Sequence, residues 1–325
     1  MRVLVTGAGG FIGSHLTELL LREGHDVRAL VRYNSRSDLG HLGAVTEDLH
    51  RRLEVKHGDV ADPFLVRDLV VGCDVVMHLA ALIGIPYSYV APDSYIRTNV
   101  SGTLNVLEAC RQAKTTRVIV TSTSEVYGTA LYTPIDEDHP LQGQSPYSAS
   151  KIAADKIAES YFRSFDLPVV TLRPFNTYGP RQSARAIIPT VLVQALTGQA
   201  EIKLGNLLPK RDFTFVTDVA RAFLLAATVK DIEGETIHFG QSEAISVSDL
   251  AELCLKVAGS RAKIISVERR MRPEKSEVGL LLCDPTKANT VLGWRPDVSL
   301  KEGVRLTAEY LVRNLGNYRV NDYVL

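Results

Sequence analysis

Short apolar runs alternate with segments of helical periodicity along the first half of the chain. Residues 3–5 form an apolar run that ends at Gly7, and over 12–23 apolar side chains recur with helical spacing until Gly24. A second apolar run at 27–31 completes a strand–helix–strand unit of about thirty residues. This unit predicts two parallel strands joined by a crossover helix.

The same alternation continues as far as residue 172. We expect further strands at 53–55, 75–79, 117–121 and 169–172, and helices over 64–71, 93–113 and 146–165. Strands that alternate with helices imply a parallel sheet covered on both faces. The sequence therefore predicts an α/β fold built on a Rossmann-type, doubly wound parallel sheet.

A change of texture after Pro174 marks the domain boundary that we expect near 175–180. Prolines and glycines cluster beyond it, and the helical periodicity becomes less regular. Residues 1–175 are expected to form the Rossmann domain, and 176–325 a smaller α/β domain. Helix and strand patterns near 212–242 are expected to return to the first domain, so the second domain is discontinuous.

Charge and composition exclude several classes of protein. Lys plus Arg and Asp plus Glu number 37 each, so the formal net charge is zero, and we expect no binding to nucleic acid, which requires a basic face. The longest apolar runs fall short of the ~18 residues that a membrane span needs, and the start lacks a signal-peptide pattern. We expect a cytoplasmic protein without membrane contact.

The cysteines form no CxxC pair, so we expect no metal site. We expect buried, reduced thiols at Cys73, Cys110, Cys254 and Cys283.

The first strand leads into a glycine-rich turn, Gly7-Ala8-Gly9-Gly10-Phe11-Ile12-Gly13, that opens the first helix. Gly7 permits a tight turn, Gly10 lets the backbone approach a pyrophosphate, and Gly13 lets the helix pack close to the strand. The helix N-terminus supplies N–H groups and partial positive charge. In a strand–turn–helix context, this spacing predicts a dinucleotide site whose contacts include Phe11 and Ile12.

The end of the second strand bears on the choice between NAD and NADP. An acidic residue there would bind the ribose 2′-hydroxyl of NAD, but this position holds Arg32, which suits a 2′-phosphate. Arg32 therefore tips the expectation slightly towards NADP. Asp59 and Val60, after the third strand, are placed to contact adenine, although Asp59 could equally be a simple turn residue.

The catalytic candidates lie after the fifth strand and at the start of the following helix. Tyr147 and Lys151 are four residues apart and share one helix face, so the ammonium can lower the phenol's pKa and hold the nicotinamide ribose. Thr123 ends the fifth strand and can share the substrate proton with Tyr147. Glu125 adds a carboxylate, which is useful when a carbon-bound proton must also be removed.

These motifs resemble the extended short-chain dehydrogenase/reductases that act as nucleotide-sugar epimerases, dehydratases and decarboxylases. The resemblance spans nearly the whole chain and includes His78-Leu79-Ala80-Ala81, Asn99-Val100-Ser101-Gly102-Thr103, STSEVYG at 122–128, YSASK at 147–151, RPFNTYGP at 173–180 and Arg211-Asp212-Phe213. It implies that residues 1–175 bind NAD(P) and that 176–325 bind the nucleotide sugar. It also implies a homodimer through the helices at 93–113 and 146–165.

The resemblance further implies roles for individual residues. Leu79, Ala80 and Ala81 would line the cofactor site, and Asn99 would support the active site. The substrate contacts that it implies are Tyr87, Ser124, Asn99, Asn176, Arg185, Arg211 and Arg272. Among these, Asn176, Arg211 and Arg272 would contact the nucleotide diphosphate, and arginine forks suit phosphate. A solvated loop position is the alternative for Arg272.

Glu125 favours one branch of this family. Simple 4-epimerases usually carry a small residue there, whereas 4,6-dehydratases and UDP-glucuronate decarboxylases carry glutamate. Ser124 departs from the Asp of many dTDP-glucose dehydratases. The stretch 173–190 is most similar to 4,6-dehydratases of legionaminic-acid-type pathways, which act on GDP- or UDP-linked N-acetylglucosamine.

We expect a 4,6-dehydration with a tightly bound, recycled cofactor. The alternative is a UDP-uronic acid decarboxylase or a 4-epimerase, in which Arg181 or Arg185 could serve a substrate carboxylate. A non-catalytic dinucleotide sensor is a third possibility.

Overall fold

A seven-stranded parallel sheet forms the centre of the computed structural model, which describes residues 1–45 and 47–318. The strand order is β10-β6-β5-β4-β1-β2-β3, and every neighbouring pair is parallel. The strands are β1 (Arg2–Thr6), β2 (Asp26–Arg32), β3 (Leu53–Gly58), β4 (Val75–His78), β5 (Arg117–Thr121), β6 (Val169–Pro174) and β10 (Thr236–Phe239). The predicted Rossmann-type fold is confirmed.

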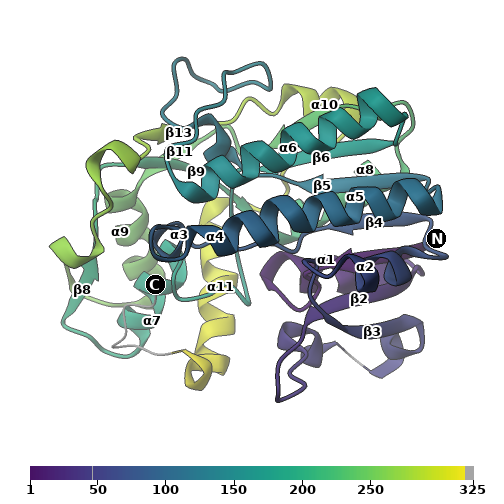
Figure 1. Cartoon of the computed structure of the whole chain (residues 1–325). Helices are drawn as coiled ribbons and strands as arrows, with labels where there is room; N and C mark the ends of the chain where they lie inside the picture. The colour runs from purple at the N-terminus through teal and green to yellow at the C-terminus, as the bar shows by residue number, and fades with distance from the viewer. Residues whose placement is uncertain (46, 319–325) are drawn as a thin grey trace.

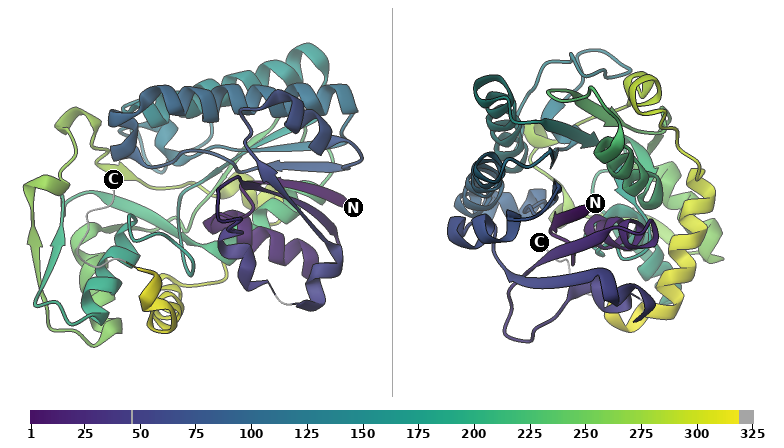
Figure 2. Two further views of the ribbon diagram at one scale, coloured as in Figure 1. Left: turned by 60° about the horizontal axis from the view of Figure 1, so that its bottom comes forward. Right: turned by 90° about the vertical axis from the view of Figure 1, so that its right-hand side faces the viewer.

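Helices cover both faces of this sheet, as Figures 1 and 2 show. One face carries α1 (Phe11–Arg22) and α8 (Val216–Thr228), and the other carries α2 (Pro63–Val70), α5 (Gly102–Ala113) and α6 (Pro146–Phe165). Each face buries its own apolar core: Leu16 and Phe223 belong to the first, and Val66, Val106 and Ala158 to the second. Strands buried on both faces explain the nearly continuous apolar runs in the sequence.

A smaller sheet and a helical layer lie beside the large sheet, on the left in Figure 1. The sheet contains β7 (Asn176–Tyr178), β9 (Lys210–Phe215), β11 (Ala244–Ser246) and β13 (Leu280–Leu281), and a separate pair contains β8 (Glu201–Leu204) and β12 (Lys263–Ser266). Helices α7 (Ile187–Leu196), α9 (Val247–Ala258) and α11 (Leu300–Asn314) complete a third apolar core.

The segment near 212–242 divides between the two sheets. Strand β9 lies in the smaller sheet, whereas α8 packs on α1 and β10 extends the large sheet beside β6. The chain therefore crosses to the smaller sheet after β6 and returns with α8. The domain division that we place at residue 175 stays a prediction.

The strand order reverses at β1, which has β2 on one side and β4 on the other. In open α/β sheets, ligands bind in the crevice beyond the carboxyl ends of strands at such a switch point. The glycine turn follows β1, and Leu79 to Ala81 follow β4, so both segments lie at this crevice.

Two further expectations can be compared with the structure. All four cysteines are buried free thiols, as expected. Within residues 1–45 and 47–318, no helix combines the length and the apolar character that a membrane crossing requires.

Candidate active site

The glycine turn packs directly against the loop that follows β4. Gly7 has φ of +71°, and a Cβ added there would lie 2.8 Å from the backbone nitrogen of Ala80. A Cβ at Gly13 would collide with the backbone of the turn itself, at the carbonyl of Gly7. Both positions therefore require glycine, for the backbone conformation in one case and for close packing in both.

The first turn of α1 is left open for an anion. Its N-cap residue is Gly10, which provides no side-chain acceptor for the first N–H groups of the helix. Unsatisfied N–H groups and the helix dipole together favour a phosphate at this end. The turn and the open helix start therefore fit the pyrophosphate of a dinucleotide, as the sequence predicted for Gly7 to Gly13.

Arg32, Asp59 and Val60 lie together at the ends of β2 and β3. The Nε atom of Arg32 is 3.9 Å from Oδ2 of Asp59, and the arginine side chain is 76% exposed. Asp59 accepts a hydrogen bond from the N–H of Ala61, as a turn aspartate would, and Val60 is buried. The loosely held Arg32 can reorient towards a ligand, so its predicted contact with a 2′-phosphate is sterically open.

Tyr147 lies at the start of α6, close to Thr123. The hydroxyl of Thr123 accepts a hydrogen bond from the N–H of Glu125 at 3.2 Å, and it donates to Tyr147. Burial raises the pKa of Tyr147, and the charge of Glu125 acts in the same direction, while the bond from Thr123 lowers it. The net direction is upward, opposite to the lowering that the Tyr–Lys spacing predicts.

Lys151 is buried one turn further along α6. Its Nζ donates to the backbone carbonyl of Thr121, at the end of β5, at 2.6 Å. Burial lowers the pKa of Lys151, and the nearby carboxylate of Asp155 opposes this shift. The lysine is thus held at the strand end beside Thr123, which brings three of the four predicted catalytic residues together.

Asp155 belongs to a buried network that the sequence reasoning missed. Its Oδ2 accepts hydrogen bonds from Ser122 Oγ at 2.7 Å and from Arg173 Nε and Nη2 at 3.1 and 3.0 Å. Arg173 also donates to the hydroxyl of Tyr127 at 2.9 Å. The network fixes α6 to β5 and β6 behind the catalytic residues. Asp155 lies four residues after Lys151 on the same helix face, and this spacing was the signal in the sequence that could have revealed it.

Glu125 completes the predicted catalytic set. It lies in the short 3-10 helix η4 (Ser124–Tyr127), whose N-cap is Thr123. Its charge acts on the pKa values of both Tyr147 and Arg211, so the carboxylate lies near the catalytic tyrosine and near the arginine of the smaller sheet. Ser124, predicted to contact the substrate, is 2% exposed.

Asn99 has a supporting position in the structure. It lies in a π-helical turn (Ile96–Ser101) before α5 and is 1% exposed. Its side-chain oxygen accepts from the N–H of Leu82 at 2.8 Å, and its nitrogen donates to the Leu82 carbonyl and to Ser150 Oγ, both at 2.9 Å. Because both amide groups are engaged within the protein, Asn99 fixes the loop at residue 82 to α6.

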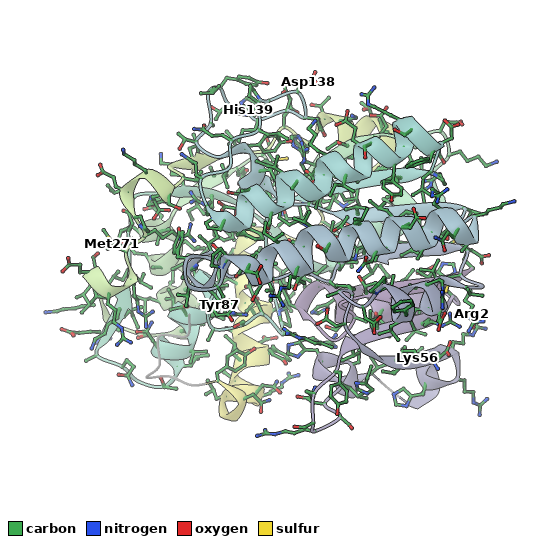
Figure 3. The ribbon with its side chains drawn as sticks, in the orientation of Figure 1. Arg2, Lys56, Tyr87, Asp138, His139 and Met271 are labelled. Carbon is green, nitrogen blue, oxygen red and sulfur yellow. The ribbon has the colours of Figure 1, made fainter. Side chains whose placement is uncertain are left out.

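Tyr87 lies on α3 (Ile85–Val90), where Figure 3 labels it. Its ring is 6.2 Å from that of Tyr95, and Tyr95 is 6.2 Å from Tyr147 in an edge-on arrangement. Burial raises the pKa of Tyr95, and the charge of Arg185 opposes this shift, so the arginine approaches the same aromatic group. Tyr87 and Arg185 therefore lie on the Tyr147 side of the crevice, and their contact with substrate stays a prediction.

Arg181 is committed elsewhere. Its Nη2 is 2.8 Å from Glu18 on α1, and its Nη1 is 3.4 Å from Ser14 Oγ. It thus joins the loop after β7 to the dinucleotide helix.

The remaining predicted contacts come from the smaller sheet and the loop before β13. Asn176 begins β7 and pairs with Phe213 of β9. Arg211 projects from β9 with an 8% exposed side chain, and its Nη2 is 3.5 Å from Oε1 of Glu277. Arg272 Nη1 is 3.6 Å from the same oxygen. The structure therefore brings both predicted diphosphate arginines together around one carboxylate.

Comparison with known proteins identifies the family. A model of the family described as GDP-mannose 4,6 dehydratase matches residues 4–307. The low-salt glycan biosynthesis protein Agl12 of Haloferax volcanii is 34% identical over 315 residues, which cover 95% of this chain and 98% of that protein. The chain belongs to the nucleotide-sugar epimerase and dehydratase family.

Solved members of this family have the same fold throughout. UDP-glucuronic acid 4-epimerase from Bacillus cereus, in complex with UDP-glucuronic acid and NAD, has a TM-score of 0.88 at 30% identity, covering 97% of this chain and 100% of that one. The dTDP-glucose 4,6-dehydratase DesIV from Streptomyces venezuelae, also with NAD, has a TM-score of 0.86 at 30% identity, covering 98% and 99%. Both reaction types thus occur among the relatives, and the family-level resemblance in the sequence is confirmed.

His78 and Thr103 occur in two of the family motifs, but the sequence alone gave them no role. His78 is buried between Thr6 and Thr103, with ring nitrogens 2.8 and 3.0 Å from the two hydroxyls. Thr103 donates to the carbonyl of Asn99, so its oxygen is free to accept from Nε2–H of His78. Thr6 in turn accepts the N–H groups of Leu79 and Ala80, both at 3.1 Å. Burial, with the charge of Lys151, lowers the pKa of His78 to about 3, so a neutral imidazole ties together both cofactor loops.

Proposed function

We propose that this enzyme is a nucleotide-sugar 4,6-dehydratase that makes a 4-keto-6-deoxy sugar nucleotide. The observation that carries the proposal is the position of Glu125, two residues after Thr123 and close enough to Tyr147 to influence its pKa. A carboxylate beside the alcohol-oxidising pair adds a base for a carbon-bound proton, which dehydration requires. Simple epimerisation has no such requirement.

The substrate would lie between the two halves of the site. Arg211 and Arg272 offer guanidinium groups for a diphosphate, and Asn176 lies at the start of the neighbouring strand β7. Tyr87 and Arg185 border the crevice near Tyr147, where the sugar would bind. Together with the similarity of residues 173–190 to legionaminic-acid-type enzymes, this favours a GDP- or UDP-linked hexose or N-acetylhexosamine.

Each catalytic residue then has a defined task. Tyr147, hydrogen-bonded to Thr123, takes the proton of the C4 hydroxyl, and Lys151 provides positive charge and a contact for the nicotinamide ribose. The ketone at C4 makes the C5 proton acidic, and Glu125 removes this proton and delivers it to the C6 hydroxyl, which leaves as water. When hydride returns to C6, C5 takes up a proton that comes from solvent. The glycine turn, Gly7 to Gly13, would hold NAD(P), which would supply a hydride acceptor for C4 and a hydride donor for C6 and would be recycled without net consumption.

Cofactor choice depends on Arg32 in this proposal. NAD is present in both solved relatives described above, whereas Arg32 favours a 2′-phosphate. Arg32→Ala should weaken NADP binding and leave NAD binding unchanged, as measured by calorimetry. Equal losses for both cofactors would show that Arg32 contacts the adenosine and not the 2′-phosphate.

Arg185 supports a second candidate reaction class. Burial raises the pKa of Tyr95 and the charge of Arg185 opposes this shift, and the ring of Tyr95 lies against that of Tyr147. From this position the guanidinium group could hold a C6 carboxylate. The enzyme would then be a UDP-uronic acid decarboxylase or 4-epimerase, in keeping with the Bacillus cereus relative. Release of carbon dioxide or retention of the C6 oxygens would distinguish these reactions from dehydration.

Glu125→Gln tests the proposed role of the carboxylate. We expect this variant to oxidise C4, seen as reduced cofactor, but to lose exchange of the C5 proton with deuterated solvent and to release no dehydrated product. Tyr147→Phe is the matched comparison, because it should block both C4 oxidation and C5 exchange. Normal product formation by Glu125→Gln would refute the proposal.

We also propose a homodimer through α5 and α6, which lie side by side over one face of the large sheet in Figure 1. Light scattering of the purified protein gives the mass that decides this.

A further inference from the structure

Glu277 stands out among the charged groups near the proposed substrate site. One of its carboxylate oxygens, Oε1, lies 3.5 Å from Arg211 Nη2 and 3.6 Å from Arg272 Nη1. All three side chains are largely or mostly buried, with exposed fractions of 18%, 8% and 30% for Glu277, Arg211 and Arg272. A single oxygen therefore lies between two guanidinium groups, as an oxygen of a bound phosphate would.

The hydrogen-bonding capacity of these arginines is not used up. Nη1 of Arg272 is buried and has no hydrogen-bond partner among the residues that the structure describes. Arg211 donates to its neighbour's carbonyl, at Lys210, but meets Glu277 only at the outer limit of a hydrogen bond. A buried donor without an acceptor is costly, so this site gains from an anion that reaches both arginines.

A second buried arginine of the same chain shows the difference. Arg173 contacts Asp155 through two nitrogens at 3.1 and 3.0 Å, and both side chains are less than 7% exposed. That geometry holds a structural pair in place. Glu277 lacks such short contacts and reaches solvent, so it can leave the arginines at a smaller cost.

The segment that carries Arg272 and Glu277 is fixed over the site by its neighbour. Ser276 Oγ donates to the carbonyl of Gln144 at 2.7 Å, and Tyr89 Oη lies 2.6 Å from the Ser276 Oγ atom. Figure 3 labels Met271 in this segment and Tyr87 in the helix that also carries Tyr89. The backbone beside Glu277 is therefore anchored, and exchange of the carboxylate for a ligand requires only side-chain movement.

We propose that the carboxylate of Glu277 competes with the substrate diphosphate for Arg211 and Arg272. When a nucleotide sugar binds, Glu277 must leave the two arginines. This inference rests on the proposed function, because it takes the ligand of the two arginines to be a nucleoside diphosphate. The charge of Glu125 also acts on the pKa of Arg211, so Glu125 belongs to the same cluster. Its two arginines and two carboxylates have a net charge of zero. A diphosphate entering a neutral cluster gains little until Glu277 withdraws.

Competition of this kind determines which ligands bind well. A ligand with one negative charge only substitutes its charge for that of Glu277, so it gains no net attraction to the arginines. A diphosphate brings additional negative charge to them. With Glu277 in place, only a ligand that carries more than one negative charge gains net attraction from the arginines. Removal of the carboxylate should strengthen the binding of every ligand whose phosphate groups must displace it, and should leave a ligand without phosphate unchanged.

Titration calorimetry of Glu277→Gln with UDP and GDP tests the proposal on the cofactor-loaded enzyme. The amide keeps the size of the side chain and removes its charge, so we expect about tenfold tighter binding of the diphosphate that the wild type prefers. Binding of the corresponding nucleoside, without phosphates, should not change. Glu274→Gln is the matched control, since Glu274 is exposed and carries the same charge three residues earlier; it should bind like the wild type.

The direction of the change decides the outcome. Weaker diphosphate binding by Glu277→Gln would show that the glutamate organises the arginines, and affinity equal to that of Glu274→Gln would show that it has no part in binding; either overturns the proposal. Equal gains for nucleoside and diphosphate would also overturn it, since they indicate a general change of the pocket. If neither protein binds any nucleoside diphosphate, the substrate class itself fails, which is a failure of the proposed function and distinct from the others.

Discussion

Thr123 provides the most direct test of how the protein sets the reactivity of Tyr147. The threonine hydroxyl accepts the N–H of Glu125 and donates to the phenol, and this second bond lowers the pKa of Tyr147 against the upward shift from burial. Thr123→Val keeps the shape of the side chain and removes the donor. The pKa of Tyr147 should therefore rise further.

The size of this effect follows from the charge that the bond stabilises. A hydrogen bond to a charged group contributes about 1.5–3 kcal/mol. At about 1.4 kcal/mol per pKa unit, its loss raises the pKa of Tyr147 by roughly one to two units. Because the deprotonated phenol is the base, activity at a fixed pH below the pKa should fall by about ten- to a hundredfold.

The assay is the pH dependence of kcat/KM with an accepted nucleotide sugar. For Thr123→Val the rising limb of the profile should move to higher pH, so that part of the lost activity returns in alkaline buffer. Thr123→Ser retains the hydroxyl and should follow the wild type. A uniform loss at every pH, with no displacement of the limb, would refute the reasoning and assign Thr123 a purely steric role.

Three further predictions concern the scaffold around the site. Gly13→Ala should abolish cofactor binding without unfolding the protein, as checked by calorimetry and circular dichroism, because the added methyl meets the backbone of the turn. Asp155→Ala leaves the buried charge of Arg173 unpaired and should cost about 3–5 kcal/mol of unfolding free energy in urea titrations. Burial lowers the pKa values of His78 and His238, to about 3 and about 4, so the folded state binds fewer protons than the unfolded state at acidic pH. The free energy of unfolding should therefore fall by about 1.4 kcal/mol per pH unit for each histidine as pH drops from near 6.5 towards 4. Urea titrations that give the same unfolding free energy across this range would contradict the prediction.

The large sheet could be predicted from the sequence because its strands are buried on both faces and alternate with amphipathic helices. The helix expected over 93–113 is divided in the structure into α4 (Pro92–Tyr95), the π-helical turn at Ile96–Ser101 and α5. The other strands and helices expected as far as residue 172 occur within a few residues of their predicted bounds. The smaller sheet could not be predicted in this way. Its strands β7 and β13 have three and two residues, too few for a periodic pattern to emerge.

The site was predictable where its residues are close in sequence. The catalytic tyrosine and lysine share a helix turn, and Thr123 and Glu125 share a strand end, so local spacing revealed them. Glu277 escaped notice because its partners are 66 and 5 residues away in the chain and meet only in the fold. The raised pKa of Tyr147 was missed for a related reason: burial depends on the packed structure, whereas the sequence shows only the neighbouring charge.

The central claim is that this enzyme eliminates water from a nucleotide sugar. The most direct measurement incubates the protein and cofactor with a panel of UDP-, GDP-, dTDP- and CDP-sugars and reads the product masses. The account predicts a product lighter than its substrate by one water molecule, with no net consumption of cofactor, and with a GDP- or UDP-sugar as the best substrate. A product lighter by one carbon dioxide, or a new sugar of unchanged mass, would contradict it.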